Sequence, residues 1–192
     1  MSPFERSTAI TTPRLRLLPL EVGDAKEMAS VLGDQRLHEF IGGRPATLAG
    51  LRDRYARLAA GSPDPDEVWL NWIVRRRSDA QAVGTVQATI VTRDERSTAN
   101  VAWIIGVDWQ SQGFASEAAR ALIDWLTRHG ADEVVAHIHP DHRASAAVAA
   151  RAGLRPTDEQ ADGEQVWRTQ PLIHPIPSSA KLRPRREHGR AS

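Results

Sequence analysis

The sequence predicts an α/β protein of the mixed, α+β kind, in which helices cover a mostly antiparallel sheet. Apolar residues alternate with polar ones in some segments, as in strands, and recur every three or four residues in others, as in helices. The predicted order is one strand, two helices, three strands, a helix, a strand, a helix and two strands, which gives about seven strands and four helices. Hairpin-linked strands followed by strand–helix units are typical of a mixed sheet with helices packed on it.

The first half of the chain contains one strand and two helices before the main run of strands. Arg14-Leu15-Arg16-Leu17-Leu18 alternates polar and apolar side chains, which indicates a half-buried strand. Helical spacing follows from Asp24 to Leu32. Thr47 is a suitable N-cap for a second helix, whose expected buried face is formed by Leu48, Leu51, Tyr55 and Leu58.

The remaining elements follow at short intervals. We expect strands over residues 68–74, 82–91 and 98–105, joined by hairpin turns at residues 75–79 and 93–97. Helices are expected over 113–129 and 143–152, the second ending at Gly153, with a strand between them over 134–138. Two weaker strands are expected over residues 154–157 and 165–169.

Composition limits the class of protein. With 192 residues and 41% hydrophobic residues, the chain suits one domain, which we assign to residues 1–172. Absence of cysteine excludes disulfides, thiolate metal sites and a cysteine nucleophile. No apolar run is long enough to span a bilayer and no signal peptide is recognisable, so a cytoplasmic protein without a membrane partner is expected.

Charge is close to balanced, at +1, which does not favour nucleic acid as a partner. The exception is the C-terminal segment 173–192, which carries five basic residues against one acid: Lys181, Arg183, Arg185, Arg186 and Arg190 against Glu187. It has almost no apolar periodicity, and we therefore predict a disordered basic tail, with a solvated terminus favoured over a nucleic-acid or membrane contact.

One turn between a strand and a helix carries the strongest functional signal. The strand that ends at Ile105-Gly106-Val107 is followed by Gln110-Ser111-Gln112-Gly113-Phe114-Ala115, and a helix begins there. The first N–H groups of a helix have no partner within it, and they suit an anionic phosphate together with the helix dipole. Gly113 permits close backbone approach. An ordinary tight turn is the competing interpretation; the glycine patterns of other nucleotide-binding proteins are absent.

The turn resembles the acetyl-CoA-binding motif of the GNAT acyltransferases, Arg/Gln-x-x-Gly-x-Gly/Ala. Gly113-Phe114-Ala115-Ser116-Glu117-Ala118 is similar to Gly-Tyr-Ala-Thr-Glu-Ala in the branch that contains the ribosomal-protein N-acetyltransferases. Thr12-Pro13-Arg14-Leu15-Arg16-Leu17 resembles the opening strand of that branch. Pro140-Asp141-His142-Arg143-Ala144-Ser145, followed by Gly153-Leu154-Arg155, resembles a third segment, Pro-x-Asn-x-Ala-Ser…Gly-Phe. The three matches keep the family's order and spacing.

The resemblance implies a GNAT fold and the direct transfer of an acetyl group from acetyl-CoA to an amine. The backbone of Gln110, Ser111, Gln112, Gly113, Phe114 and Ala115 would bind the pyrophosphate of this co-substrate. Ile105 and Val107 would pair their backbone with its pantetheine arm. The fourth and fifth strands would splay apart at Ile104 and Val135 to make room for that arm. The two helices between Asp24 and Ala60 and the final hairpin would enclose the amine acceptor, and a homodimer is left open.

The resemblance also implies catalytic residues and exposes two departures. Ser145 aligns with a serine near the CoA sulfur, where it would protonate or hydrogen-bond the leaving thiolate; an ordinary helical serine is the alternative. His142 replaces an asparagine that contacts pantetheine, so it is placed among the cofactor-binding residues. Asn100 replaces a glutamate that serves as a base in many relatives, and an amide cannot accept that proton. The base is then His38, Glu39 or solvent.

Two further interpretations concern metals and the class of function. His137, His139 and His142 have spacing that a metal site can use, but no carboxylate motif accompanies them, and we expect no metal. The acceptor is predicted to be a small-molecule amine or a protein N-terminus. The alternative function is a non-catalytic acyl-CoA sensor or interaction module, favoured by Asn100. Six tryptophans are expected in the core or in pocket walls, with Trp69, Trp72 or Trp103 beside the acceptor.

Overall fold

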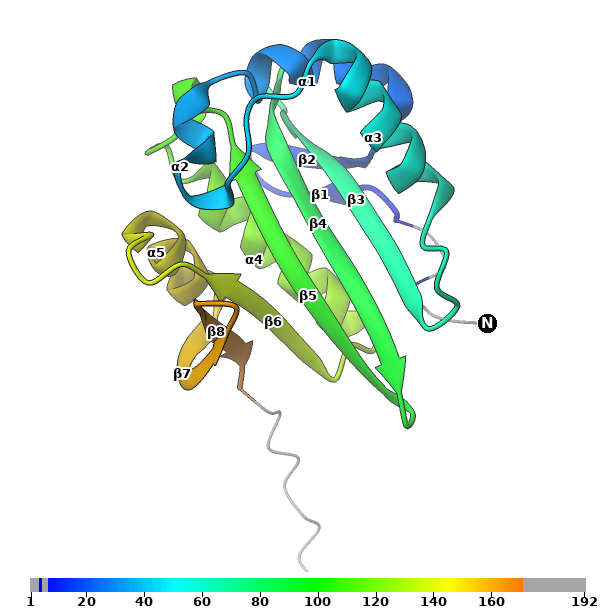
Figure 1. Cartoon of the computed structure of the whole chain (residues 1–192), viewed down its shortest axis with the longest axis vertical. Helices are drawn as coiled ribbons and strands as arrows, with labels where there is room; N and C mark the ends of the chain where they lie inside the picture. The colour runs from blue at the N-terminus through cyan, green and yellow to red at the C-terminus, as the bar shows by residue number, and fades with distance from the viewer. Residues whose placement is uncertain (1–3, 5–6, 171–192) are drawn as a thin grey trace, which may run out of the picture.

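The computed structural model describes residue 4 and residues 7–170. In that part of the chain one open sheet runs through the molecule, in the order β1-β2-β3-β4-β5-β6-β8-β7 (Figure 1). The strands are β1 (Ile10–Thr11), β2 (Leu15–Pro19), β3 (Glu67–Arg76), β4 (Ala82–Arg93), β5 (Arg96–Ile105), β6 (Glu133–Ile138), β7 (Leu154–Ala161) and β8 (Glu164–Thr169). Only β5 and β6 pair in parallel; all other neighbours are antiparallel. This confirms the predicted mixed sheet.

Five α-helices and three short 3-10 helices join the strands within the described residues. The α-helices are α1 (Ala25–Val31), α2 (His38–Ile41), α3 (Leu48–Ala60), α4 (Phe114–Arg128) and α5 (Arg143–Ala152). The 3-10 helices are η1 (Val22–Asp24), η2 (Gln35–Leu37) and η3 (Val107–Trp109). None of these helices is long and apolar enough to cross a membrane. The predicted tail, residues 173–192, lies outside the described residues.

Two apolar clusters hold helices on opposite faces of the sheet (Figure 1). The larger cluster joins α4 to one face; its helix contributes Phe114, Ala118, Leu122 and Leu126, spaced four residues apart as one helical stripe. The smaller cluster joins α1 and α3 to the other face through Met28, Leu51, Tyr55 and Ile73. The sequence pattern predicted both stripes, although Leu48, expected to be buried, is 39% exposed.

Local signals in the sequence set the ends of several elements. Thr47 caps α3 as predicted, since its Oγ1 accepts a hydrogen bond from Gly50 N at 3.1 Å. Gly153 ends α5 with φ of +101°. Between β4 and β5, Asp94 and Glu95 both have positive φ, the arrangement of a two-residue hairpin turn. The short β1 and α2 were not predicted, because two to four residues are too few to show a periodicity.

Three tryptophans are buried, namely Trp72, Trp125 and Trp167, and the other three are half-buried. Trp72 is fully buried and meets Trp125 edge to face, with ring centroids 5.5 Å apart. Both indoles bond to one residue: Trp72 Nε1 donates to the carbonyl of Thr8 at 2.8 Å and Trp125 Nε1 to its hydroxyl at 3.2 Å. Trp72 is therefore a core residue and not part of an acceptor pocket.

Candidate functional site

The sheet opens between β5 and β6, as the sequence led us to expect (Figure 1). The two strands pair at three positions, Thr98 with Glu133, Ala99 with Val134 and Asn100 with Val135. From Val101 onward β5 continues beside β4 alone, to Ile105. Backbone groups on the β6 side of this segment are left for other partners. The candidate site lies at this opening.

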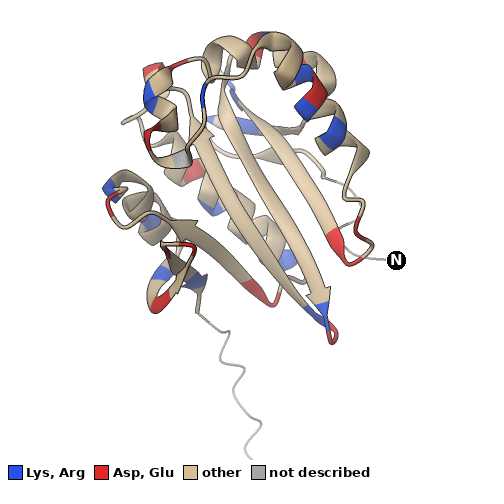
Figure 2. Ribbon diagram, viewed as in Figure 1, with Lys and Arg blue, Asp and Glu red and all other residues tan. Residues whose placement is uncertain are grey.

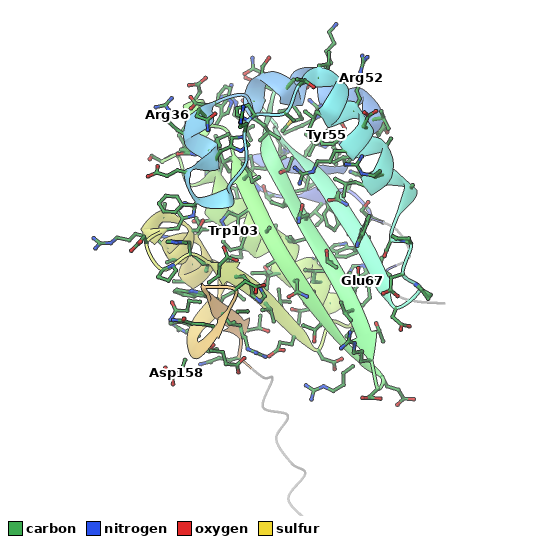
Figure 3. All side chains as sticks on the ribbon, in the orientation of Figure 1. Arg36, Arg52, Tyr55, Glu67, Trp103 and Asp158 are labelled. Carbon is green, nitrogen blue, oxygen red and sulfur yellow. The ribbon has the colours of Figure 1, made fainter. Side chains whose placement is uncertain are left out.

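Two cavities meet at the opening. The larger, about 620 Å³ and here called the turn cavity, lies between the end of β5, the start of α4 and α5. The smaller, about 400 Å³ and here called the sheet cavity, lies over β4, β5 and β6. Four residues line both: Phe40, Trp103, His142 and Ser145. Figure 3 shows one of them, Trp103, on the side of β5 that faces β6 and α5. The two cavities therefore form one continuous path.

The turn before α4 presents a row of unpaired backbone donors to the turn cavity. Ser111 and Gly113 both have left-handed backbones, with φ of +60° and +81°. Within the described residues, no acceptor binds the backbone N–H groups of the six residues from Ser111 to Ser116. Successive free N–H groups at a helix start create a concave site for an anion, and the helix dipole adds to it.

A polar network behind the turn fixes its position. Glu117, in the first turn of α4, accepts from Thr12 Oγ1 at 2.6 Å and from Arg14 backbone N at 2.9 Å. Its other oxygen accepts from Arg14 Nε at 2.6 Å. Arg14 Nη1 in turn donates to the carbonyl of Gln112 at 2.9 Å, and its guanidinium lies over the ring of Phe114, 4.8 Å from the centroid. β2 and the turn are thus held together by one arginine.

The environment of Glu117 keeps it ionised. Burial raises the pKa of this carboxyl, but the hydrogen bonds from Thr12 and Arg14 and the charge of Arg14 outweigh burial and lower it below its usual value. The sequence motif contained Thr12, Arg14 and Glu117, yet none of them was predicted as a site residue. Their contacts join residues 103 to 105 positions apart, which no local pattern reveals.

Cationic side chains outnumber anionic ones around the turn cavity. Arg36, Arg143 and Arg151 line it, against Glu39 and Asp141. Arg36 is engaged by Asp34 at 2.7 Å, whereas Arg143 and Arg151 have no ion-pair partner within the described residues. Figure 2 shows blue segments on α5. A polyanion with more than one phosphate suits this arrangement of charge.

Most of the predicted donor-site residues line the turn cavity, namely Ile105, Gln110, Ser111, Gly113, Phe114, Ala115 and His142. Val107 and Gln112 do not. Val107 begins η3 and does not continue the strand, and its carbonyl accepts from Gln110 N at 3.2 Å. The side chain of Gln112 turns back to the carbonyl of Asp108 at 3.2 Å. Ile105 keeps its place at the strand end, where its carbonyl accepts from Gln110 Nε2 at 3.0 Å.

The sheet cavity is lined by neutral polar groups and one carboxylate, with Gln87, Thr89 and Asn100 from β4 and β5 and Glu164 from β8. The central parts of β3, β4 and β5 carry no charged residue, as the tan ribbons in Figure 2 show. No lysine or arginine lines this cavity within the described residues. A ligand that carries a single amine can therefore enter without meeting a like charge.

The histidines separate into two groups. His137 and His139 line the sheet cavity, and His142 lines both cavities. His38, one of the predicted bases, lines neither, and its Nδ1 lies 3.0 Å from the carbonyl of Gly42. No group of three or more histidine, cysteine, aspartate or glutamate residues that could hold a metal ion occurs in the described part of the chain.

Tyr55, the single tyrosine, is remote from the opening. It is buried in the smaller cluster with α1, and its hydroxyl has no hydrogen-bond partner among the described residues. Burial raises its pKa to about 12. It lines neither cavity.

Comparison with known proteins identifies a matching family and several solved structures with a similar fold. Residues 14–155 match a family model described as an acetyltransferase (GNAT) domain. No curated protein matches the chain. The ribosomal-protein S5 alanine acetyltransferase from Vibrio fischeri has a similar structure, with a TM-score of 0.70 at 17% identity, over 87% of this chain and 98% of that one.

Two further solved structures share the fold. An acetyltransferase from Agrobacterium tumefaciens is 24% identical, with a TM-score of 0.64 over 87% of this chain and 96% of that one. The microcin C7 self-immunity acetyltransferase, solved with acetyl-CoA and AMP, is 15% identical, with a TM-score of 0.67 over 82% and 93%. At these identities the likeness is one of fold.

Proposed function

The chain belongs to the GNAT acetyltransferase family, and on that premise we propose that it transfers an acetyl group from acetyl-CoA directly to a primary amine. The amine is that of a protein N-terminus or of a small molecule. The observation that carries the proposal is the continuous path at the opening between β5 and β6, where a row of free N–H groups lies at one end and a cavity without lysine or arginine at the other.

The chemistry of the turn cavity fits the donor. Its free N–H groups from Ser111 to Ser116 suit a pyrophosphate, and Arg143 and Arg151 supply positive charge for a further phosphate. The pantetheine arm would run along the open edge of β5 past Ile105 and beside His142. When bound, acetyl-CoA supplies an activated acyl group as a thioester. The chain itself has to bind and orient the two substrates and to exchange protons with them.

The acceptor would enter the sheet cavity and meet the thioester where the cavities join. Holding the two reactants in line removes much of the entropic barrier of a bimolecular reaction, by effective molarities on the order of 10⁵ M or more. Ser145 lines both cavities at this junction, and its hydroxyl makes no hydrogen bond within the described residues. We assign it the role of donor to the leaving thiolate.

A panel of amines tests the proposed function. The full chain is incubated with acetyl-CoA and, separately, with peptides that have different N-terminal residues, with polyamines and with aminoglycosides, and the free thiol is measured. The similar structures include a ribosomal-protein acetyltransferase and a protein solved with paromomycin and acetyl-CoA, so the panel includes both classes. Amine-dependent thiol release above the hydrolysis rate is the expected result.

One observation favours a second, non-catalytic function. Asn100, which cannot act as a base, lines the sheet cavity. A chain that binds acetyl-CoA in calorimetry yet acetylates no amine in the panel would be a sensor or interaction module, and the enzymatic proposal would be wrong. A chain that binds no acetyl-CoA would remove both functions.

A further inference from the structure

His142 holds a position that no other titratable side chain in the described residues shares: it lines both the turn cavity and the sheet cavity. It precedes α5, with φ of −83° and ψ of 66°. Its backbone is fixed on both sides, since its N–H donates to His139 O at 2.8 Å and its carbonyl accepts from Ala146 N at 3.1 Å. The side chain is therefore held at the junction of the two cavities.

The imidazole ring is oriented by stacking and keeps its nitrogens free. It lies against Phe40 of α2, with centroids 4.2 Å apart and planes inclined by 8°. Stacking uses the face of a ring, whereas the two nitrogens bond in its plane. Neither nitrogen has a hydrogen-bond partner among the described residues. A positioned imidazole with both nitrogens unengaged is able to accept a proton from a ligand.

The other candidate bases do not meet the same geometric condition. Glu39 lines only the turn cavity, and Glu164, His137 and His139 line only the sheet cavity. His139 is also partly engaged, because its Nδ1 accepts from the backbone N–H of Asp141 at 3.2 Å. A general base has to reach the nitrogen that attacks the thioester, so it must lie where both substrates meet.

The environment favours the neutral form of His142. Burial lowers the pKa of this imidazole, the nearby His139 lowers it further, and Glu39 acts in the opposite direction, with a net decrease. The charged and titratable groups that line the two cavities around it come from every neighbouring element: Arg36 and Glu39, His137 and His139, Asp141, Arg143 and Arg151, and Glu164. A neutral imidazole at neutral pH is the form that can act as a base.

From this geometry we infer that His142 is the general base of the acetyl transfer, and that Ser145, three residues further along, is its partner acid. The inference rests on the proposed function. An amine that arrives as ammonium loses its first proton to water. As the amine nitrogen bonds to the thioester carbon, His142 takes the second proton, and the carbon–sulfur bond breaks. The thiolate gains a proton from the Ser145 hydroxyl, which recovers one from His142 directly or through water, so both side chains return to their starting forms.

The pH dependence of the reaction tests this role. For the wild type, with the fastest amine of the panel, kcat/KM should fall on the acid side through the pKa of His142, below its usual value of 6.5. Histidine NMR titration of the free protein gives that pKa independently of activity. His142→Asn should remove this acid limb and lower kcat/KM by about 10² to 10⁴-fold, the span of general acid–base catalysis.

Two variants separate a catalytic role from a structural one. Asparagine is the residue that the family motif has at this position, so His142→Asn should keep the affinity for acetyl-CoA within about twofold while the rate falls. Asn100 lines the same sheet cavity. Adding Asn100→Glu to His142→Asn should therefore restore about tenfold or more of the rate, with a carboxylate as the base. His139→Asn, which alters a residue of the sheet cavity alone, should keep the acid limb.

Several outcomes would overturn the inference. If His142→Asn keeps both the rate and the acid limb, or if it loses affinity for acetyl-CoA in proportion to the rate, His142 is not the base. A limb that disappears in His139→Asn but persists in His142→Asn would assign the base to His139. A wild type that acetylates no amine would instead remove the proposed function, which is a different failure.

Discussion

The turn cavity and the sheet cavity are adjacent but are built in different ways. The turn cavity presents backbone: free N–H groups over Ser111–Ser116, positioned by left-handed residues and held from behind by Arg14 and Glu117. The sheet cavity presents side chains: amides, hydroxyls and imidazoles from β4, β5 and β6, with Glu164 from β8. A site built from backbone groups requires small residues at a few fixed positions. A site built from side chains can be formed by many different combinations of residues.

This difference explains why the sequence predicted one region and not the other. The turn before α4, which we propose binds the donor, needs a glycine where φ is positive and a helix immediately afterwards, and both features can be read locally. The acceptor side depends on which strands become neighbours. Three experiments test how far the two regions are independent, in order of decreasing expected effect.

The largest effect is expected from Gly113→Glu. The new carboxylate would stand in the anion site, and its charge would repel a pyrophosphate, so CoA affinity should fall by about 100-fold or more. An added Cβ would meet only Arg14 Nη2, at 3.3 Å, the end of a flexible side chain. A left-handed backbone costs a non-glycine residue about 1 to 2 kcal/mol, so the protein should still fold. Calorimetric titration with CoA measures the result.

The matched control for this variant is Gly61→Glu. Gly61 follows α3 with φ of +87°, and nothing lies within 4 Å of its added Cβ. The Gly61→Glu variant has the same backbone penalty and adds the same charge, but at a position away from both cavities. Equal CoA affinity in Gly113→Glu and Gly61→Glu would remove the turn from the donor site.

An intermediate effect is expected from Ser145→Ala, at the boundary between the regions. A hydroxyl that stabilises the leaving thiolate acts in the transition state, so kcat should fall by about 10- to 1000-fold. CoA affinity should change little, because the contacts proposed for the pyrophosphate come from backbone groups. Steady-state rates with the fastest amine of the panel decide the matter, and Ser30→Ala on α1, which lines neither cavity, is the control. An unchanged kcat would leave thiolate protonation to water.

The smallest effect concerns the network behind the turn. Because the folded pKa of Glu117 lies below its unfolded value near 4.5, the carboxylate stabilises the fold above about pH 4.5. That contribution is lost as the pH falls through the folded pKa. Glu117→Gln should lower the melting temperature at pH 7 by a few degrees, corresponding to roughly 1 to 2 kcal/mol for a partly exposed ion pair with hydrogen bonds.

The pH dependence of this change in melting temperature is the control for the prediction. The difference in melting temperature between Glu117→Gln and the wild type should shrink as the pH approaches 3 and the carboxyl becomes protonated. A difference that is independent of pH would mean that the shape of the side chain, and not its charge, holds β2 to the turn.

More of the fold than of the candidate site could be predicted from the sequence. Alternation and helical spacing located the longer strands and helices, since each places an apolar stripe on a core. The same patterns gave no sign of α2, although its Phe40 lines both cavities and stacks on His142. Val107 was expected at the end of the strand, with its backbone free for the pantetheine arm; the chain turns into η3 there instead. Local rules describe elements, and long-range packing decides which side chains meet.

The three-residue pairing between β5 and β6 has a consequence for the mechanics of the molecule. It is the seam between a sheet of five strands and one of three, since Asn100 and Val135 end the ladder that joins them. Amide hydrogens on the open edge of β5 should exchange with solvent faster than those facing β4. A donor bound along that edge would span the seam, so acetyl-CoA should slow this exchange and raise the melting temperature further as its concentration increases. The ligand would then act as a mechanical tie between the two parts of the sheet.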